Sequence, residues 1–173
     1  MGQQSSQVIA DAQRLNPGIA IIRTVQIGHF GSGGDLCIAR AAALKHQDEL
    51  RALTNGAYIV ILVAGLGGGT GSGVSPILAG MAKQSGAQTF AVVVTPFDWE
   101  VGRYANAFHA IKALRNHCDY MMALSNQAAG GAMGDDATLE DVIKQQELEG
   151  TKSILKLVKS GILLCHERRS SPV

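Results

Sequence analysis

A dense glycine segment, Ala64–Gly73, is the first place in the sequence where residue types and spacing could do chemistry. It reads Ala-Gly-Leu-Gly-Gly-Gly-Thr-Gly-Ser-Gly and lies between an apolar run, 57–63, and a helix-like run, 74–83. Residues without a Cβ let successive backbone N–H groups converge on one point, and a helix start adds unpaired donors and the positive end of a dipole. Thr70 and Ser72 add hydroxyl donors. This central glycine loop therefore predicts an anion site suited to phosphates.

Two familiar phosphate motifs fit the central glycine loop poorly. It has neither the lysine nor the G-x-x-x-x-G-K-[ST] spacing of a P-loop. Gly67-x-Gly69-x-x-Ser72 is close to the dinucleotide fingerprint, but no acidic residue stands at a strand end about twenty residues later. A dinucleotide-binding oxidoreductase is thus a weak alternative. A second alternative is that the glycines serve only the tight packing of a strand against a helix.

A second cluster, Gly31-Ser32-Gly33-Gly34-Asp35, precedes an alanine-rich helical pattern. This upstream glycine loop could border the same anion or could be an ordinary strand-to-helix turn. Asp35 can cap the helix that follows it. Beside a phosphate chain its carboxylate would require Mg²⁺ between the two negative groups.

Polar residues follow two further apolar runs. Glu100 and Arg103 come after 89–95, and Asn126 comes after 119–124. A carboxylate can accept hydrogen bonds from ribose hydroxyls, an arginine can hold phosphate or ribose oxygens, and an amide can read a purine edge. The alternatives are an ion pair near a helix start for the first two and a turn residue for Asn126.

Strand-like and helix-like patterns alternate along the chain, which predicts an α/β doubly wound sheet. We expect strands over 19–27, 57–63, 89–95 and 119–124, helices over 36–53, 74–83, 102–116 and 138–159, and a flexible segment over 128–136. The helix faces expected to be buried carry Ile38, Ala42, Leu50 and Leu53 in the first helix and Phe108, Ile111 and Leu114 in the third. Because ligands bind beyond the carboxyl ends of parallel strands, the candidate loops should meet at one edge. These are Asp11, Gly31–Asp35, Gly65–Gly73, Pro96–Glu100 and Asn126.

Composition narrows the class of protein. With 173 residues and 46% hydrophobic content, the chain can form one domain with a core. Fifteen basic and 14 acidic residues leave a net charge of +1, so nucleic acid is not an expected partner. The apolar runs are too short to span a membrane, and the first 20 residues lack a signal-peptide core, which favours the cytoplasm. Three separated cysteines indicate reduced thiols, and the histidines show no metal-ligand spacing.

The central glycine loop closely resembles the tubulin/FtsZ signature G-G-G-T-G-[TS]-G, with the Ala-Gly that precedes it in the FtsZ form. Other segments resemble the same family at its spacing. Gly31–Asp35 resembles an upstream G-A-G-G-N loop, and Pro96-Phe97-Asp98-Trp99-Glu100 resembles P-F-x-F-E. Arg103 matches a ribose-contacting arginine if one residue is deleted, and Asn126 takes the place of a guanine-contacting asparagine. Asp11 matches an aspartate that borders the nucleotide.

The resemblance implies a three-layer, Rossmann-like α/β domain with a mostly parallel sheet, without the family's first strand and C-terminal domain. Residues 1–160 would form a partial nucleotide-binding domain, and 161–173 a flexible tail. The implied ligand is GTP or GDP, with Mg²⁺ as a candidate ion, and the implied partners are copies of the chain or full-length FtsZ-like subunits in cytoplasmic, head-to-tail filaments of bacterial cell division. The implied binding residues are Asp11, Gly31, Gly33, Gly34, Asp35, Gly67, Gly68, Gly69, Thr70, Gly71, Ser72, Gly73, Glu100, Arg103 and Asn126.

The sequence departs from the family pattern at three places. The family's first glycine loop would lie before Met1. The aspartate that reads guanine would fall at Leu148, with Glu147 beside it, and 161–169 lacks the acidic N-x-D-x-x-D loop that completes a neighbour's site. Because a positioned water needs an orienting carboxylate, we assign no catalytic residue and expect little hydrolysis by this chain alone. The alternatives are a non-hydrolysing protein that caps or modulates filaments, and a fragment without a function of its own.

Overall fold

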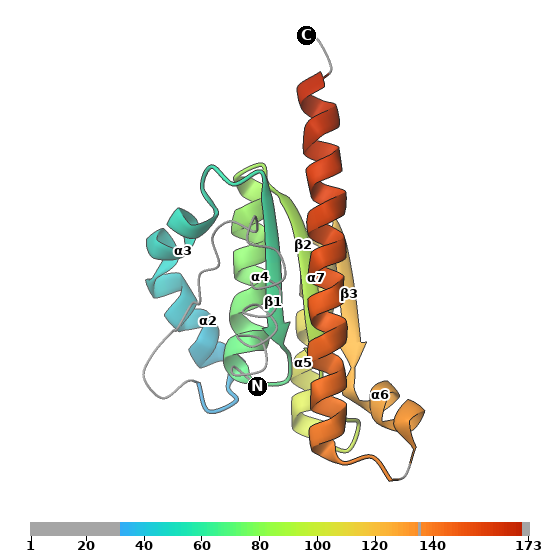
Figure 1. Ribbon diagram of the computed structural model, residues 1–173. Coiled ribbons are helices and arrows are strands. Elements are labelled where there is room, and N and C mark those ends of the chain that lie inside the picture. The colour runs from blue at the N-terminus through green and yellow to red at the C-terminus, as the bar shows by residue number, and fades with distance from the viewer. Residues whose placement is uncertain (1–31, 135, 171–173) are drawn as a thin grey trace.

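The computed structural model describes residues 32–134 and 136–170 (Figure 1). The expected strand over 19–27 and the candidate residues Asp11 and Gly31 lie outside these ranges, so their expectations stay predictions. For residues 160–170 only the backbone is described.

Three parallel strands form the described sheet, in the order β1-β2-β3. They are β1 (Ile59–Gly65), β2 (Gln88–Thr95) and β3 (Tyr120–Ser125). Each lies within two residues of the strand expected from the sequence. In the register, Ala64 pairs with Val93, and Val93 pairs with Ala123. The central strand β2 is buried along almost its whole length, as its near-continuous apolar run predicts for a strand covered on both faces.

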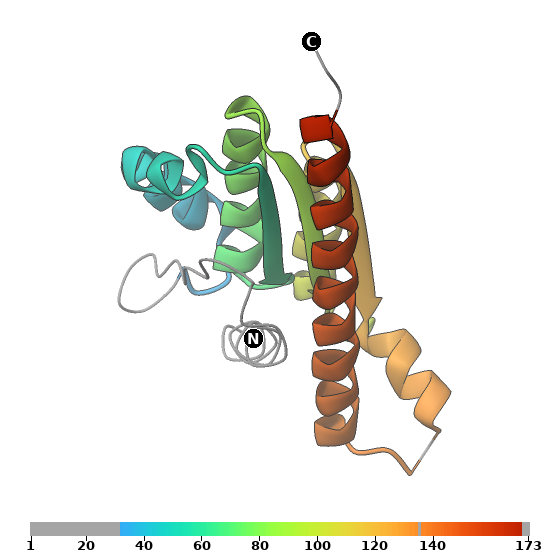
Figure 2. The same ribbon diagram turned by 45° about the horizontal axis from the view of Figure 1, so that its top comes forward.

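Helices cover both faces of this sheet and give three layers (Figures 1 and 2). On one face, Ala91 and Val93 pack with residues of α4 (Gly69–Gln84) and α5 (Val101–Arg115). On the other face, Phe90 and Val92 pack with α7 (Leu139–Ser170). The period-two alternation of β2 thus divides the core between the two helix layers. The expected α/β architecture is confirmed.

The helix expected over 36–53 is two helices, α2 (Leu36–Lys45) and α3 (Gln47–Thr54). The break falls at His46, whose φ of −105° and ψ of 26° are not helical. Both helices pack on α4 through small or apolar side chains, Ala39, Ala43 and Leu50. Ile38, which we expected on the buried face, is 57% exposed. Alanines face α4 because the two helices approach closely; a Cβ on Gly73 would lie 2.8 Å from the Cβ of Ala39.

Three further expectations need correction. The segment expected to be flexible contains a helix, α6 (Asn126–Met133), which the Ser125 hydroxyl caps by accepting the N–H of Ala128 at 3.1 Å. Phe108 is 60% exposed, because the inner face of α5 is filled by Ala107, Ala110 and Leu114. The helix expected to end at Lys159 continues to Ser170, through most of the expected tail. Leucine, glutamate and arginine in that tail favour helix, which outweighs the single Gly161.

The start of α7 agrees with its predicted capping box. Thr138 N donates to Asp141 Oδ2 at 3.0 Å, and Asp141 N donates back to Thr138 Oγ1 at 3.2 Å. Over the described ranges, no helix is both long and apolar enough to cross a membrane.

Candidate functional site

The carboxyl ends of all three strands meet at one edge of the sheet. Gly65, at the end of β1, pairs with Val94, and Thr95, at the end of β2, pairs with Ser125 at the end of β3. The central glycine loop, the segment 96–100 and Asn126 therefore leave the sheet side by side, as expected for a parallel α/β sheet.

The central glycine loop turns directly into α4, which begins at Gly69, several residues earlier than the sequence pattern suggested. Its N-cap, Gly68, offers no side chain to the first turn of the helix. A Cβ on Gly71 would overlap the Gly65 carbonyl oxygen, and one on Gly69 would overlap Ser32 Oγ. Only glycine allows this close approach, and it leaves a helix start without a side-chain cap at the sheet edge.

The two hydroxyls of this loop have different surroundings. Ser72 is fully buried, and its Oγ accepts the N–H of Gly67 at 2.8 Å. It therefore braces the turn from inside. Thr70 is partly exposed in the first turn of α4. Ser32 Oγ, which the sequence analysis did not single out, is buried against Gly69 without a hydrogen-bond partner in the described structure.

The upstream glycine loop lies against the central one. Gly33 and Gly34 have left-handed φ angles of 57° and 90°, which suit glycine. Asp35 Oδ1 accepts the N–H groups of Cys37 at 2.6 Å and Ile38 at 3.2 Å. Asp35 thus caps α2, one of the two roles that the sequence left open, and this oxygen is already engaged.

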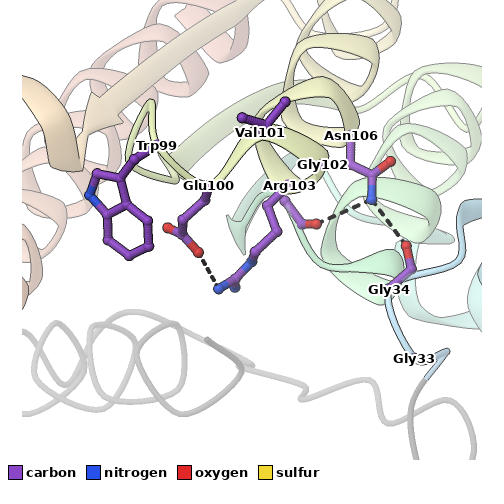
Figure 3. A pocket seen from close by; sticks show the side chains of 9 residues that line it. Gly33, Gly34, Trp99, Glu100, Val101, Gly102, Arg103 and Asn106 are labelled. Atoms are coloured by element: carbon purple, nitrogen blue, oxygen red, sulfur yellow. Dashed lines mark hydrogen bonds and ion pairs between the residues drawn. The ribbon is translucent and has the colours of Figure 1, made fainter.

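Asn106 joins the two glycine loops and was missed by the sequence analysis. Its Nδ2 donates to the carbonyl oxygens of Gly34 at 3.0 Å and Gly67 at 3.3 Å (Figure 3). It lies three residues after Arg103 on α5, so it is on the same helix face. That spacing from a candidate residue was the signal available in the sequence.

Glu100 and Arg103 form an ion pair with each other (Figure 3). The Glu100 side chain is 11% exposed and also accepts the N–H of Phe97 at 3.1 Å, whereas the Arg103 side chain is 44% exposed. The carboxylate is therefore held by the loop and orients the guanidinium. Because Arg103 keeps part of its surface free, it can still reach a ligand oxygen.

These groups border an open hollow of about 610 Å³. Its lining residues are Gly33, Gly34, Gly67, Trp99, Glu100, Val101, Gly102, Arg103 and Asn106. Trp99 is 67% exposed and stacks on Phe97 with ring centroids 5.5 Å apart. Five of the residues predicted for the site therefore come together here with a tryptophan beside them.

Asn126 does not line this hollow but lies at the end of the next strand. It is 4% exposed, and its Oδ1 has no hydrogen-bond partner in the described structure. The α7 residue beside it is Gln146, whose Nε2 donates to the Ser125 carbonyl oxygen at 2.9 Å. Leu148 is 50% exposed and Glu147 is partly buried. Gln146 is a second residue that could not be singled out from the sequence. The helical pattern over 138–159 does not show which of its residues contacts the end of β3.

Metal ligands and the Cys118 thiol were the remaining candidates for chemistry among the described residues. Within 32–134 and 136–170, no group of three or more His, Cys, Asp or Glu side chains could hold a metal ion. Burial raises the pKa of the Cys118 thiol to about 11, so this thiol stays protonated at neutral pH. The described edge offers a helix start without a side-chain cap, an arginine guanidinium and amide side chains.

Known proteins resemble this chain in sequence and in fold. The model of the Tubulin/FtsZ family, GTPase domain, matches residues 3–133. The cell division protein FtsZ of Haemophilus influenzae is 39% identical over 140 residues, which are 78% of this chain and 33% of that protein. An empty FtsZ dimer of M. jannaschii aligns with a TM-score of 0.69 at 28% identity, over 86% of this chain and 40% of that one. CetZ from Methanosaeta thermophila, 17% identical with a TM-score of 0.71 over 90% of this chain and 52% of that one, shares the fold.

The chain spans about a third of the length of the cell division protein FtsZ of Haemophilus influenzae and of its counterparts from Coxiella burnetii and Neisseria gonorrhoeae. The family match covers most of the chain, and the parallel sheet with its glycine loops is the corresponding architecture. The chain belongs to the Tubulin/FtsZ family, of which it carries an FtsZ-like GTPase domain.

Proposed function

We propose that this chain binds a guanine nucleotide, GTP or GDP, at the carboxyl edge of its sheet. The observation that carries the proposal is the pair of glycine loops that Asn106 joins beside the start of α4. Phosphate oxygens would meet the N–H groups of Gly68–Gly71 and the Thr70 hydroxyl, where the helix dipole favours negative charge. Glu100 and Arg103 would meet the ribose, and Asn126 the base.

Magnesium fits this proposal as a companion of the phosphates. Mg²⁺ keeps most of its waters and commonly binds through substrate phosphates with one or two protein carboxylates. Asp35 is the exposed carboxylate of the upstream glycine loop, and its Oδ1 already caps α2. It could assist through its other oxygen, so nucleotide phosphates would supply most of the ligands.

Hydrolysis by the chain alone is proposed to be near background. Among the described residues that line the hollow, Glu100 is the only carboxylate, and it is paired with Arg103. A general base must reach the attacking water, and Glu100 is held away from that role. Turnover would then need residues from a partner subunit, as in a head-to-tail assembly of cytoplasmic FtsZ-like subunits during cell division.

Isothermal titration with GTP, GDP and ATP, with and without Mg²⁺, tests nucleotide binding. We expect one site that prefers guanine nucleotides and gains affinity from Mg²⁺. No binding of GTP or GDP, or tighter binding of ATP, would contradict the proposal. Light scattering with GTP, for the chain alone and with a full-length FtsZ, tests assembly; unchanged scattering in both would remove the filament role but leave nucleotide binding standing.

A further inference from the structure

Helix α5 exposes a row of large apolar side chains on its outer face. Val101 and Phe108 are more than half-exposed, and Tyr104 is nearly half-exposed. Their spacing of three and four residues places them on one side of the helix, whereas Ala110 and Leu114, which belong to the core, lie on the opposite side. Single exposed apolar residues are common on protein surfaces, but an aligned row with two aromatic rings is typical of a contact surface.

Charges of opposite sign lie at the two ends of this row. Lys112 and Arg115 continue the same helix face toward the C-terminal end of α5, and Asp98 lies in the loop before its N-terminal end. All three side chains are exposed, and none of them forms an ion pair with another described residue. Helix α5 itself contains no carboxylate. Its outer surface is therefore acidic just before the helix, apolar over the first half and basic over the last turns.

This surface is complementary to itself when two copies of α5 run antiparallel. A two-fold axis midway between Tyr104 and Phe108 brings Tyr104 of one copy opposite Phe108 of the other, because paired residues lie at equal distances from the axis. Asp98 and Arg115 are nearly equally far from that axis along the chain, so each end brings an aspartate near an arginine of opposite charge. A parallel pair would instead bring like charges together, which is unfavourable. The antiparallel arrangement therefore satisfies both the apolar row and the charges.

We infer that the outer face of α5 binds a second copy of this chain, as an antiparallel pair of α5 helices about a two-fold axis. Because α5 lies on the sheet face opposite α7, this pairing leaves the α7 layer uncovered (Figures 1 and 2). One helix per copy buries less than the roughly 800 Å² per partner of a standard stable interface. The dimer should therefore be weak, with a dissociation constant on the order of tens of micromolar. A two-fold contact closes at two copies, so it is distinct from a head-to-tail contact and does not depend on nucleotide binding.

Sedimentation equilibrium of the chain without nucleotide tests this pairing. We expect a monomer–dimer equilibrium, and Phe108→Glu should raise the dissociation constant at least about tenfold, because it places a charge from each copy at the centre of the contact. Leu44→Glu is the matched control: Leu44 is exposed to a similar extent on α2, and its variant should dimerise like the unmodified chain. Both side chains are exposed, so both variants should keep the fold, and their melting temperatures check this.

A charge exchange tests the antiparallel register. Asp98→Arg and Arg115→Glu should each raise the dissociation constant about fivefold, whereas the double variant should return it to within about twofold of the unmodified chain. The inference would be overturned by a chain that stays monomeric up to about 500 µM, by a dimer that survives Phe108→Glu, or by a double variant weaker than both single variants. Species that keep growing with concentration would also overturn it, since they would indicate a contact that does not close. Each of these results leaves the proposed nucleotide binding intact, because the titration with GTP and GDP measures that separately.

Discussion

The two ends of the proposed site are built in different ways. At the phosphate end, backbone groups of the glycine loops are hydrogen-bonded to side chains. The Gly67 N–H donates to Ser72 Oγ, and the carbonyl oxygens of Gly34 and Gly67 accept from Asn106 Nδ2. At the base end, Asn126 begins α6 and Gln146 of α7 donates to the neighbouring Ser125 carbonyl oxygen, and one side-chain oxygen of each residue has no partner in the described structure. Among the described residues, Ser32 Oγ is the one buried side-chain oxygen at the phosphate end without a partner. We therefore expect the phosphate end to be largely preformed and the base end to depend more on its ligand. Variants at the two ends should consequently fail in different ways.

Gly71→Ala should have the largest effect on nucleotide affinity, because it changes the backbone of the phosphate end. The new Cβ would overlap the Gly65 carbonyl oxygen, so the turn into α4 must move. We expect affinity for every nucleotide to fall by about a hundredfold, which corresponds to roughly 3 kcal/mol. Isothermal titration measures this loss.

Gly131→Ala is the matched control for Gly71→Ala. A Cβ on Gly131, in α6, would meet nothing within 4 Å, so this change should leave binding unaltered and stabilise the helix by up to about 1 kcal/mol. A Gly71→Ala chain that binds like the unmodified one would show that the loop adapts, and the idea of a preformed end would be wrong.

Ser72→Ala should lower stability more than selectivity. It leaves the N–H of Gly67 without its buried acceptor, which costs about 1–3 kcal/mol of unfolding free energy. Chemical denaturation measures the loss. Ser75→Ala is the comparison, because the Ser75 hydroxyl only adds a donor to the Gly71 carbonyl oxygen within α4. Equal losses for the two variants would mean that Ser72 has no special part in the turn.

Asn106→Ala should weaken all nucleotides alike. The glycine loops lose their common donor, and we expect GTP and ATP affinities to fall together by about fivefold, or roughly 1 kcal/mol. Asn116→Ala, at the exposed far end of α5, is the control. A change in the GTP-to-ATP ratio for Asn106→Ala would erase the distinction between the two ends.

Most of the preformed end was predictable from sequence, because its signals are local. Glycine density predicted the central loop, and parallel strands predicted that it would meet 96–100 at one edge. The sequence predicted that Ser72 donates to phosphate; the structure adds that Ser72 is fully buried and that its Oγ accepts the Gly67 N–H inside the turn. A side-chain contact within five residues depends on the path of the backbone, which composition does not reveal.

The base end was harder to predict, since it depends on contacts between distant segments. The sequence singled out Asn126 because it follows a strand. Gln146 was missed because its partner, Ser125, is 21 residues away, and only the packing of α7 across the sheet brings them together. An ungapped count along the sequence from Asn126 instead pointed to Leu148, which is half-exposed. The helical period alone does not say which face will meet the end of a strand.

The smallest expected effect concerns the start of α7, the helix that carries Gln146. Hydrogen bonds from the Thr138 hydroxyl and backbone N–H hold the pKa of Asp141 below its ordinary value of 3.8. A lowered pKa means that the carboxylate stabilises the fold fully above that ordinary value and loses this contribution as pH falls through the folded pKa. Melting temperatures of the unmodified chain and Asp141→Asn, compared from pH 7 down to the acid limit, should differ at neutral pH and converge at low pH, because a protonated aspartate resembles asparagine. Melting curves that stay parallel throughout would show that the charge of Asp141 does not contribute to the cap. The stability of α7 would then come from its packing against Phe90 and Val92.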